Sequence, residues 1–180
     1  RSPRSISPEN VSVDSAKKFL VSANYDGGTV TAFNLDTGNE LWSADVPQAH
    51  GVVISEKYVY ATSLTRRSIV KLDRQSGKLL LEVGNLGWKP AENQYLWPVT
   101  IDILNKNTLI VSDAQTGFIS LLDSESLQVK SYFGGNGRGK KYFNYPYFAT
   151  VIDDQVWVSS AFRPQILMLD RQSLKSIERY

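Results

Sequence analysis

A short pattern occurs four times along this chain, and no other feature limits the fold as strongly. Each copy is an apolar segment that ends in Leu-Asp, followed by a polar turn and another apolar segment. The four aspartates are Asp36, Asp73, Asp123 and Asp170. They follow one another at spacings typical of a structural repeat of about 40–50 residues. A unit of this length that contains four short strands is typical of one β-propeller blade.

The segments between the turns have the period of strands rather than helices. Short runs rich in Val, Ile, Leu, Tyr and Phe, such as residues 29–35 and 155–159, alternate with clusters of Gly, Asn, Asp, Ser and Pro. No window shows the apolar spacing of an amphipathic helix. We therefore expect an all-β fold, a β-propeller of about four four-stranded antiparallel blades in a single domain. After a Ser/Pro-rich linker or tail at residues 1–7, the approximate blades are 8–47, 48–86, 94–134 and 143–180.

The four repeated aspartates are expected to be structural. An aspartate at the start of a tight turn accepts hydrogen bonds from backbone N–H groups two residues further on. Gly38 and Gly77 supply the positive φ that such a turn needs in the first two copies. Leu127 and Leu174 stand in the other two copies, so those turns are expected to differ.

The composition excludes several classes of function. There is no Cys and a single His, His50, so thiol catalysis, Cys-ligated metals and two-His mechanisms are ruled out within one chain. The 20 basic and 18 acidic residues are too evenly balanced to indicate specific nucleic-acid binding. No apolar run has the length of a membrane span. We expect no metal and no cofactor.

The compartment is left open by the sequence. The absence of Cys is compatible with the cytoplasm but also with many secreted bacterial proteins, and a secreted or periplasmic location is favoured. The chain begins at Arg1 rather than Met, which suggests a processed chain or an excised piece.

Several segments resemble known propeller repeats. Residues 26–42, DGGTVTAFNLDTGNELW, resemble the PQQ-like and YVTN repeats, and residues 11–28 resemble YVTN and lactonase-type blades. Residues 134–146, GGNGRGKKYFNYP, and 95–98 resemble the Gly-rich entry into NHL blades. Together the resemblance covers nearly the whole chain and places it among the propeller repeats that also include WD40-like proteins. It implies the fold and carries no activity.

A chain of four blades can form either a closed ring or part of a larger ring. No strand at one end completes a blade from the other, and no Cys pair is available to lock a ring. We therefore expect an incomplete arc of a six- to eight-bladed propeller, with a closed four-bladed ring as the alternative. An open arc exposes apolar faces on its end blades, so further blades or self-association are expected.

The first functional hypothesis is a non-enzymatic binding module. In propellers the connections between blades and the turns between the second and third strands share one rim of the central channel, where ligands usually bind. The candidate rim is aromatic and cationic, which suits a protein, an anionic ligand or a carbohydrate-like ligand. Its candidate residues are Tyr25, Arg66, Arg67, Trp97, Arg138, Lys140, Phe162 and Arg163. Trp88 and Trp97, which flank a Pro-containing insertion, are the tryptophans expected to be exposed.

The second hypothesis is a lactonase-like or other hydrolytic propeller enzyme. It would use His50 and Glu9 as an acid–base pair in the channel, together with Arg66 or Arg163. A quinone-dependent dehydrogenase is a third, weaker interpretation, because only one repeat carries the PQQ-like Trp. The run Gly134–Lys140 resembles a phosphate-binding loop, but Lys141 stands where Ser or Thr is needed and no helix follows. We therefore reject nucleotide binding.

Overall fold

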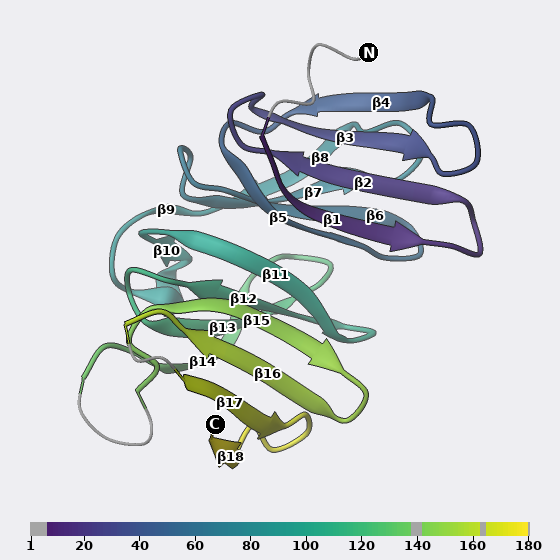
Figure 1. Cartoon of the computed structure of the whole chain (residues 1–180). Coiled ribbons are helices and arrows are strands. Elements are labelled where there is room, and N and C mark those ends of the chain that lie inside the picture. The colour runs from purple at the N-terminus through teal and green to yellow at the C-terminus, as the bar shows by residue number, and fades with distance from the viewer. Residues whose placement is uncertain (1–6, 138–141, 163–164, 180) are drawn as a thin grey trace. The chain divides into compact units, whose positions relative to one another are not determined.

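The structure, a computed structural model, describes residues 7–137, 142–162 and 165–179 (Figure 1). It contains four four-stranded antiparallel sheets and one two-stranded parallel ribbon. Among the described residues the only helix is a single 3-10 turn, η1 (Pro90–Glu92). Contacts divide the chain into two compact units, Arg1–Gly84 and Asn85–Tyr180, and each unit contains two of the four sheets.

The first unit contains two sheets in which consecutive strands pair in chain order. Blade 1 consists of β1 (Pro8–Asp14), β2 (Phe19–Asn24), β3 (Thr29–Asn34) and β4 (Glu40–Asp45). Blade 2 consists of β5 (Ala49–Ile54), β6 (Tyr58–Ser63), β7 (Ser68–Asp73) and β8 (Leu79–Val83).

The second unit repeats this organisation after a short ribbon of β9 (Asn85–Leu86) and β10 (Gln94–Tyr95). Blade 3 consists of β11 (Pro98–Asn105), β12 (Thr108–Asp113), β13 (Phe118–Asp123) and β14 (Val129–Gly134). Blade 4 consists of β15 (Pro146–Ile152), β16 (Gln155–Ser160), β17 (Gln165–Asp170) and β18 (Ser176–Arg179). The predicted fold class, an all-β propeller of four four-stranded blades, is confirmed.

The core of each unit lies between the facing sides of its two blades. In the first unit Val21 and Ala32 of blade 1 and Val59 and Val70 of blade 2 are fully buried in one cluster. The ring of Trp42 joins this cluster, and its Nε1 donates a hydrogen bond to the carbonyl of Arg74 at 2.9 Å. Small and β-branched side chains on the central strands allow the sheets to approach closely, which is how a blade buries its apolar face.

The corresponding cluster in the second unit is also mainly aliphatic. Ile110 and Ile119 of blade 3 pack with Val156 and Leu167 of blade 4, and all four are fully buried. Phe143, from the connection between the two blades, joins this cluster. Each pair of blades is therefore held together by a continuous apolar layer.

A second set of contacts joins the innermost strands of the paired blades. Ser12 Oγ of β1 accepts a hydrogen bond from the N–H of Ile54 in β5 at 3.2 Å. In the second unit, Thr100 Oγ1 and Asp102 Oδ2 of β11 accept from the N–H groups of Ala149 and Val151 in β15, at 3.1 and 2.8 Å. Polar side chains of one blade thus satisfy backbone donors of the next blade, which would otherwise be unpaired at the strand edge.

Two arginines at the same turn position reinforce these pairs. Arg74 donates to the carbonyl of Ser55 at 2.9 Å and to the Asp14 carboxylate of blade 1 at 2.7 Å. Arg171 donates to the carbonyl of Leu104 in blade 3 and to that of Asp153, both at 2.7 Å. We refer to Arg74 and Arg171 as the inter-blade arginines.

The repeated aspartates close the turns between the third and fourth strands. Asp123 Oδ1 accepts hydrogen bonds from the N–H groups of Glu125 and Ser126 and from the Ser126 hydroxyl. Asp73 has the same three contacts, with Gln75 and Ser76. Asp170 accepts from both the N–H and the hydroxyl of Ser173.

Blade 1 departs from the expectation for Asp36. Its turn is closed by Asn34, whose Oδ1 accepts from the N–H groups of Asp36 and Thr37 and from the Thr37 hydroxyl. Asn34 is the last residue of β3, as Asp73 is the last residue of β7. Asp36 instead lies in the turn and forms an exposed ion pair with Lys18 at 3.4 Å. The turn position is therefore two residues earlier than the sequence comparison indicated, because a side-chain amide oxygen accepts these bonds as a carboxylate does.

The four turns also share their backbone conformation, so the expected difference between them was wrong. Leu127 and Leu174 have φ values of 57° and 55°, close to the 71° of Gly38 and the 69° of Gly77. Leu127 donates its N–H to the carbonyl of Asp123, as Gly77 does to that of Asp73. The Leu127 side chain is fully buried, and burial of a leucine offsets the cost of a left-handed backbone.

Candidate functional site

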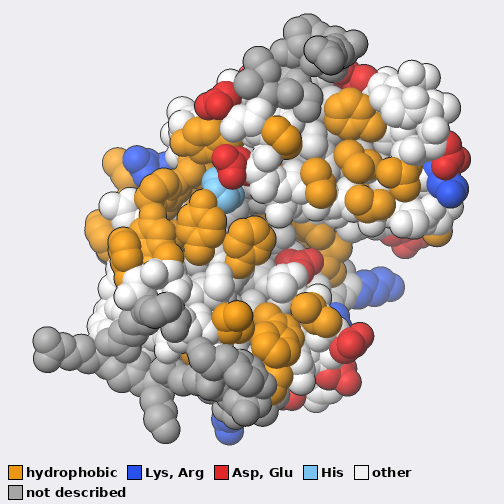
Figure 2. Space-filling view, viewed as in Figure 1, with side chains coloured by type: hydrophobic (Ala, Val, Ile, Leu, Met, Phe, Trp, Pro, Cys, Tyr) orange, Lys and Arg blue, Asp and Glu red, His pale blue; other side chains and the backbone are white. Residues whose placement is uncertain are grey.

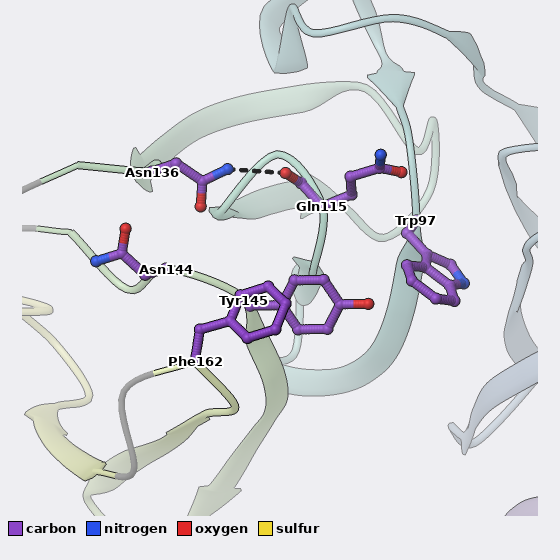
Figure 3. A pocket seen from close by; sticks show the side chains of 6 residues that line it. All are labelled: Trp97, Gln115, Asn136, Asn144, Tyr145 and Phe162. Atoms are coloured by element: carbon purple, nitrogen blue, oxygen red, sulfur yellow. Dashed lines mark hydrogen bonds between the residues drawn. The ribbon is translucent and has the colours of Figure 1, made fainter.

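The connections of the second unit border an open pocket of about 650 Å³ on one end of blades 3 and 4. Its lining comes from the connection into β11, the β12–β13 turn, the connection between β14 and β15, and the β16–β17 turn (Figure 3). We call it the rim cavity, and it is lined by Trp97, Gln115, Asn136, Asn144, Tyr145 and Phe162. A cavity of this volume is within the range of small-ligand sites.

A buried carboxylate holds two of these connections together. Asp113, which is 2% exposed at the end of β12, accepts hydrogen bonds from the N–H groups of Leu96 and Trp97 at 2.7 and 3.0 Å. It also accepts from the N–H groups of Gln115 and Thr116 at 3.1 and 3.0 Å. Burial raises the pKa of Asp113, while the backbone donors that surround it act in the opposite direction. Asp113 thus fixes the backbone from which Trp97 and Gln115 extend.

Side-chain amides order the other two connections. Asn144 accepts from the N–H of Gly137 through Oδ1 and donates to its carbonyl through Nδ2, both at 2.8 Å. Asn136 Nδ2 donates to the carbonyl of Gln115 at 2.8 Å, the bond drawn in Figure 3. The side-chain amide of Gln115 has no hydrogen-bond partner among the described residues, and it extends along the cavity beside Trp97.

The aromatic side chains of the cavity form a connected array. The Tyr145 ring lies edge-on to Trp97, with centroids 5.8 Å apart and planes at 89°. Phe162 packs against the same tyrosine at 4.5 Å and 48°. Phe162 is 75% exposed and Trp97 is 37% exposed. Large aromatic groups exposed in this way are typical of binding surfaces.

The backbone beneath Tyr145 is strained. Tyr145 has a φ of 73° and the preceding Asn144 has a φ of 50°, both in the left-handed region. Tyr145 also precedes Pro146, a position at which extended backbone is preferred. Non-glycine residues in such conformations persist where the surrounding structure fixes them, and they concentrate at functional sites. The Tyr145 carbonyl accepts a hydrogen bond from the N–H of Ala161 at 3.1 Å. Asn144, the residue before it, is held by the hydrogen bond that its own side chain accepts from the N–H of Gly137.

The first unit holds the candidates from blades 1 and 2. Tyr25 accepts a hydrogen bond from Gln48 Nε2 at 2.8 Å, and its ring lies edge-on to His50 with centroids 6.4 Å apart. His50 is 6% exposed. Glu9, by contrast, lies on the exposed part of β1. The hypothesis of a His50–Glu9 acid–base pair stays a prediction.

The cationic candidates differ in what they contact. Arg66 forms ion pairs with Asp45 at 2.7 Å and Glu82 at 3.5 Å, so its charge is balanced by two carboxylates of its own unit. Arg67 lies beside it in the same turn with a φ of 53°. Arg138, Lys140 and Arg163 lie outside the described residues.

The sequence analysis placed Trp97 and Phe162 at the rim but missed three of the residues that line the cavity. Asn136, Asn144 and Tyr145 lie in the Gly-rich connection between β14 and β15, of which only Arg138 and Lys140 were predicted at the rim. Two of them could have been predicted from the dipeptide Asn144-Tyr145 directly before Pro146. Asn favours turns and often has a left-handed backbone, and loops at strand ends often carry binding residues. No charged side chain is among the described residues that line this cavity.

A second cavity, of about 490 Å³, lies in the second unit near the turns at the other ends of the strands. Its two basic residues are engaged with the protein itself. Lys130 forms an ion pair with Asp123 at 3.0 Å, and Arg171 is the inter-blade arginine of this unit. These contacts favour the rim cavity as the candidate site.

Comparisons with known proteins agree with this fold. The sequence profile of the PQQ-like repeat type described as "Outer membrane protein assembly factor BamB" matches residues 26–120, just over half of the chain. BamB from Moraxella catarrhalis matches with 17% identity and a TM-score of 0.64, over 94% of this chain and 51% of that one.

Two further solved structures share the fold. A chain of the Kuenenia stuttgartiensis hydrazine synthase has 15% identity and a TM-score of 0.74, over 96% of this chain and 48% of that one. A chain of a nidogen/laminin complex has 15% identity and a TM-score of 0.71, over 96% and 63% of the two chains. The present chain thus spans about half to two thirds of these relatives.

A comparison with curated proteins found no match. Among the described residues, no helix has both the length and the hydropathy needed to cross a bilayer.

Proposed function

Because the chain belongs to the family of PQQ-like β-propeller repeats described as BamB, we propose that it is a non-enzymatic module that binds a protein partner at the rim of its blades. The observation that carries this proposal is the rim cavity, where exposed Trp97 and Phe162 flank Tyr145. Asp113 fixes the backbone of Trp97 there. Exposed aromatic side chains on a preorganised backbone are the groups that contribute most to protein–protein affinity.

The names of two matched proteins support a protein partner. The family profile and one solved structure are named for an assembly factor, and another structure is a complex of nidogen with laminin. These identities show the fold alone, so the role comes to this chain only as part of the proposal. The name of the family also supports a location outside the cytoplasm, which we include in the proposal.

We further propose that the four blades belong to a larger ring. The matched chains of known structure are longer, and this chain covers 48–63% of the three described above. Blade 1 also has an apolar side that does not face blade 2. Val13, Leu20 and Phe33 are paired across its strands on that side, and Val13 is 48% exposed. A further blade packed there would bury this row as blade 2 buries the other side.

The enzymatic alternative has less support. A hydrolytic site around His50 needs that side chain to be accessible to substrate, and it is 6% exposed and packed edge-on to Tyr25. A screen for lactone hydrolysis that compared the wild type with His50→Ala would restore this alternative if only the wild type were active.

The proposed function can be tested by photo-crosslinking in the source cells. A photoreactive phenylalanine analogue at position 162 is expected to give one discrete adduct with a protein. The same analogue at position 88 is the matched control, because Trp88 is 58% exposed in the same unit but does not line the cavity. Equal labelling at both positions, or no protein adduct at 162, 97 or 115, would contradict rim binding.

A further inference from the structure

We infer that Asn136 is the site at which this chain deamidates, and that the side chain of Asn144 controls the rate of the reaction. The inference does not depend on the proposed function, although both asparagines line the rim cavity. Three features carry it: the residue that follows Asn136, the exposure of Asn136, and the hydrogen bonds that hold both reacting groups.

The sequence places a reactive pair at this position. Asn136-Gly137 is the single Asn-Gly pair in the 180-residue chain. An asparagine loses its amide when the backbone nitrogen of the next residue attacks its side-chain carbon. Glycine has no Cβ to obstruct this attack, and its backbone adopts conformations that other residues disfavour. Asn136 is also exposed, so water reaches it.

The reaction consumes only water. The proton of the Gly137 N–H is lost to water or hydroxide, and the nitrogen forms a bond with Cγ of Asn136. The bond between Cγ and Nδ2 breaks, and Nδ2 leaves as ammonia after it takes up a proton, which gives a cyclic imide. Water then opens the imide at either carbonyl and gives aspartate or isoaspartate. The net change is the replacement of a side-chain amide by a carboxyl group.

In the folded chain both reacting groups are engaged in other hydrogen bonds. The N–H of Gly137 donates to Asn144 Oδ1 at 2.8 Å, so the proton that must be lost is bound to an acceptor. Asn144 Nδ2 donates to the carbonyl of Gly137 at 2.8 Å and so fixes the backbone of this glycine on both sides. Asn136 Nδ2 donates to the carbonyl of Gln115 at 2.8 Å, the bond drawn in Figure 3, which holds the amide that must leave.

Asn144 is the side chain that controls this reaction. Its own backbone is anchored, because the hydroxyl of Ser160 donates to its carbonyl at 2.9 Å. Attack on Asn136 requires that the two bonds between Asn144 and Gly137 open, and such local opening takes place without unfolding of the whole protein. The rate of deamidation should therefore follow the stability of these two bonds rather than the stability of the blades.

The product alters one side of the rim cavity. An aspartate at position 136 has no N–H to donate, so the carbonyl of Gln115 loses this bond and faces a carboxylate instead. An isoaspartate also inserts an extra carbon into the backbone of the connection between β14 and β15. Deamidation thus changes the structure of the candidate site as the chain ages.

The test is incubation of the full chain in mildly alkaline buffer, followed by mass-spectrometric peptide mapping that separates asparagine, aspartate and isoaspartate. We expect both products to accumulate at position 136 faster than at Asn39. Asn39 is the internal control, because it is also exposed in a connection but precedes Glu40 rather than a glycine. Unfolding in guanidinium chloride should accelerate the reaction at Asn136 by about 10-fold or more, as for the loss of two hydrogen bonds.

Variants of Asn144 test its control of the rate. Asn144→Gly removes both side-chain bonds to Gly137, and glycine tolerates the φ of 50° at this position. It should raise the rate at Asn136 in the folded chain by about 10-fold or more. Asn144→Asp keeps the oxygen that accepts from the N–H of Gly137, so its rate should lie between those of the wild type and Asn144→Gly. Near-ultraviolet circular dichroism of each variant checks that it is folded.

Three results would overturn the inference. They are equal rates at Asn136 and Asn39, equal rates at Asn136 in the folded and the unfolded wild type, and a wild-type rate in folded Asn144→Gly. The first two need no variant, so the inference stays testable if Asn144→Gly does not fold. None of these rates depends on a partner, whereas the crosslinking at position 162 measures partner binding alone.

Discussion

The last residue of the third strand in each blade shows that different side chains can perform the same role at one position. Asn34, Asp73, Asp123 and Asp170 all accept backbone N–H groups from the turn that follows. Four residues later, two glycines and two leucines adopt the same left-handed backbone. The turn is therefore defined by its hydrogen bonds, and the sequence can vary where burial offsets the strain.

Substitution of the two turn glycines distinguishes backbone strain from packing. Gly38 and Gly77 have nearly equal φ values, but an added Cβ at Gly38 meets nothing within 4 Å, whereas one at Gly77 lies 2.5 Å from Cε3 of buried Trp42. Gly38→Ala is expected to cost about 1–2 kcal/mol, and Gly77→Ala about 1–3 kcal/mol more. Urea unfolding at neutral pH measures both, and equal losses would show that the Trp42 contact does not limit this turn.

The turn carboxylates predict a loss of stability in acid. Hydrogen bonds from Ser126 and Lys130 lower the pKa of Asp123, and bonds from Ser76 and Ser173 lower the pKa values of Asp73 and Asp170. A lowered pKa in the folded state contributes stability that is present above the unfolded pKa of about 3.9 and is lost as the pH falls through the folded value.

Asparagine at these three positions should reduce this pH dependence. Asn34 already performs the role in blade 1, so the variant Asp73→Asn/Asp123→Asn/Asp170→Asn is expected to keep the turns. Between neutral pH and about pH 3, its free energy of unfolding should fall less than that of the wild type. Denaturant titrations at a series of pH values measure the two slopes, and parallel curves would exclude these carboxylates as the source.

At the scale of elements, each pair of blades is joined by an apolar layer and by polar contacts at its inner strands. The inter-blade arginines occupy the residue after the turn aspartate in blades 2 and 4, where blades 1 and 3 have Leu35 and Ser124. Ser124 instead donates to the carbonyl of Lys106 within its own blade. Arginine at this position thus marks the second blade of each pair.

Removal of either arginine should loosen its own pair of blades. Arg74 is 7% exposed, and Arg74→Ala leaves the carbonyl of Ser55 without this charged donor and removes the contact with the Phe19 ring at 4.7 Å. We expect a loss of about 1–3 kcal/mol. Amide hydrogen exchange should accelerate more in β1 and β5 than in β11 and β15. Arg171→Ala should show the reverse order, and the same pattern for both variants would contradict the pairing of blades.

At the scale of the whole molecule, the side of blade 1 that faces away from blade 2 is an apolar surface of the first unit. Val11 and Val13 of β1 are 56% and 48% exposed, and Figure 2 shows hydrophobic side chains over this blade. If the four blades belong to a larger ring, the 180-residue chain alone leaves this side without its neighbour. Apolar area of this kind favours association.

We therefore expect the isolated chain to self-associate in a concentration-dependent way. The variant Val11→Ser/Val13→Ser should weaken association by about tenfold, as expected for roughly 50 Å² of apolar contact at 25 cal/mol per Å². Leu86→Ser is the control, because Leu86 is 64% exposed on β9 rather than on blade 1. Sedimentation velocity measures the assembly, and a chain that is monomeric at every concentration would argue against an uncovered blade side.

The strands and turns of the four blades follow from the amino-acid sequence, because strand period and turn chemistry are local properties. Residues two apart decide whether a segment alternates, and residues two to four apart decide where it turns. The four blades and the rim positions of Trp97 and Phe162 could therefore be predicted. The role of Asn34 in its turn could not be predicted. The repeat was aligned on its aspartates, and the side-chain amide of Asn34 forms the same hydrogen bonds without being an aspartate.

The candidate site, by contrast, follows from how the strands and their connections pack. The rim cavity combines residues from four connections, and its backbone depends on Asp113, which the sequence presents as one more acidic residue at the end of a strand. The charge balance of Arg66 likewise depends on Asp45 and Glu82, which are far from it in sequence. These groups are far apart in the sequence, and no local sequence pattern relates them. They come together only because the blades pack, so the site could not be predicted from the sequence.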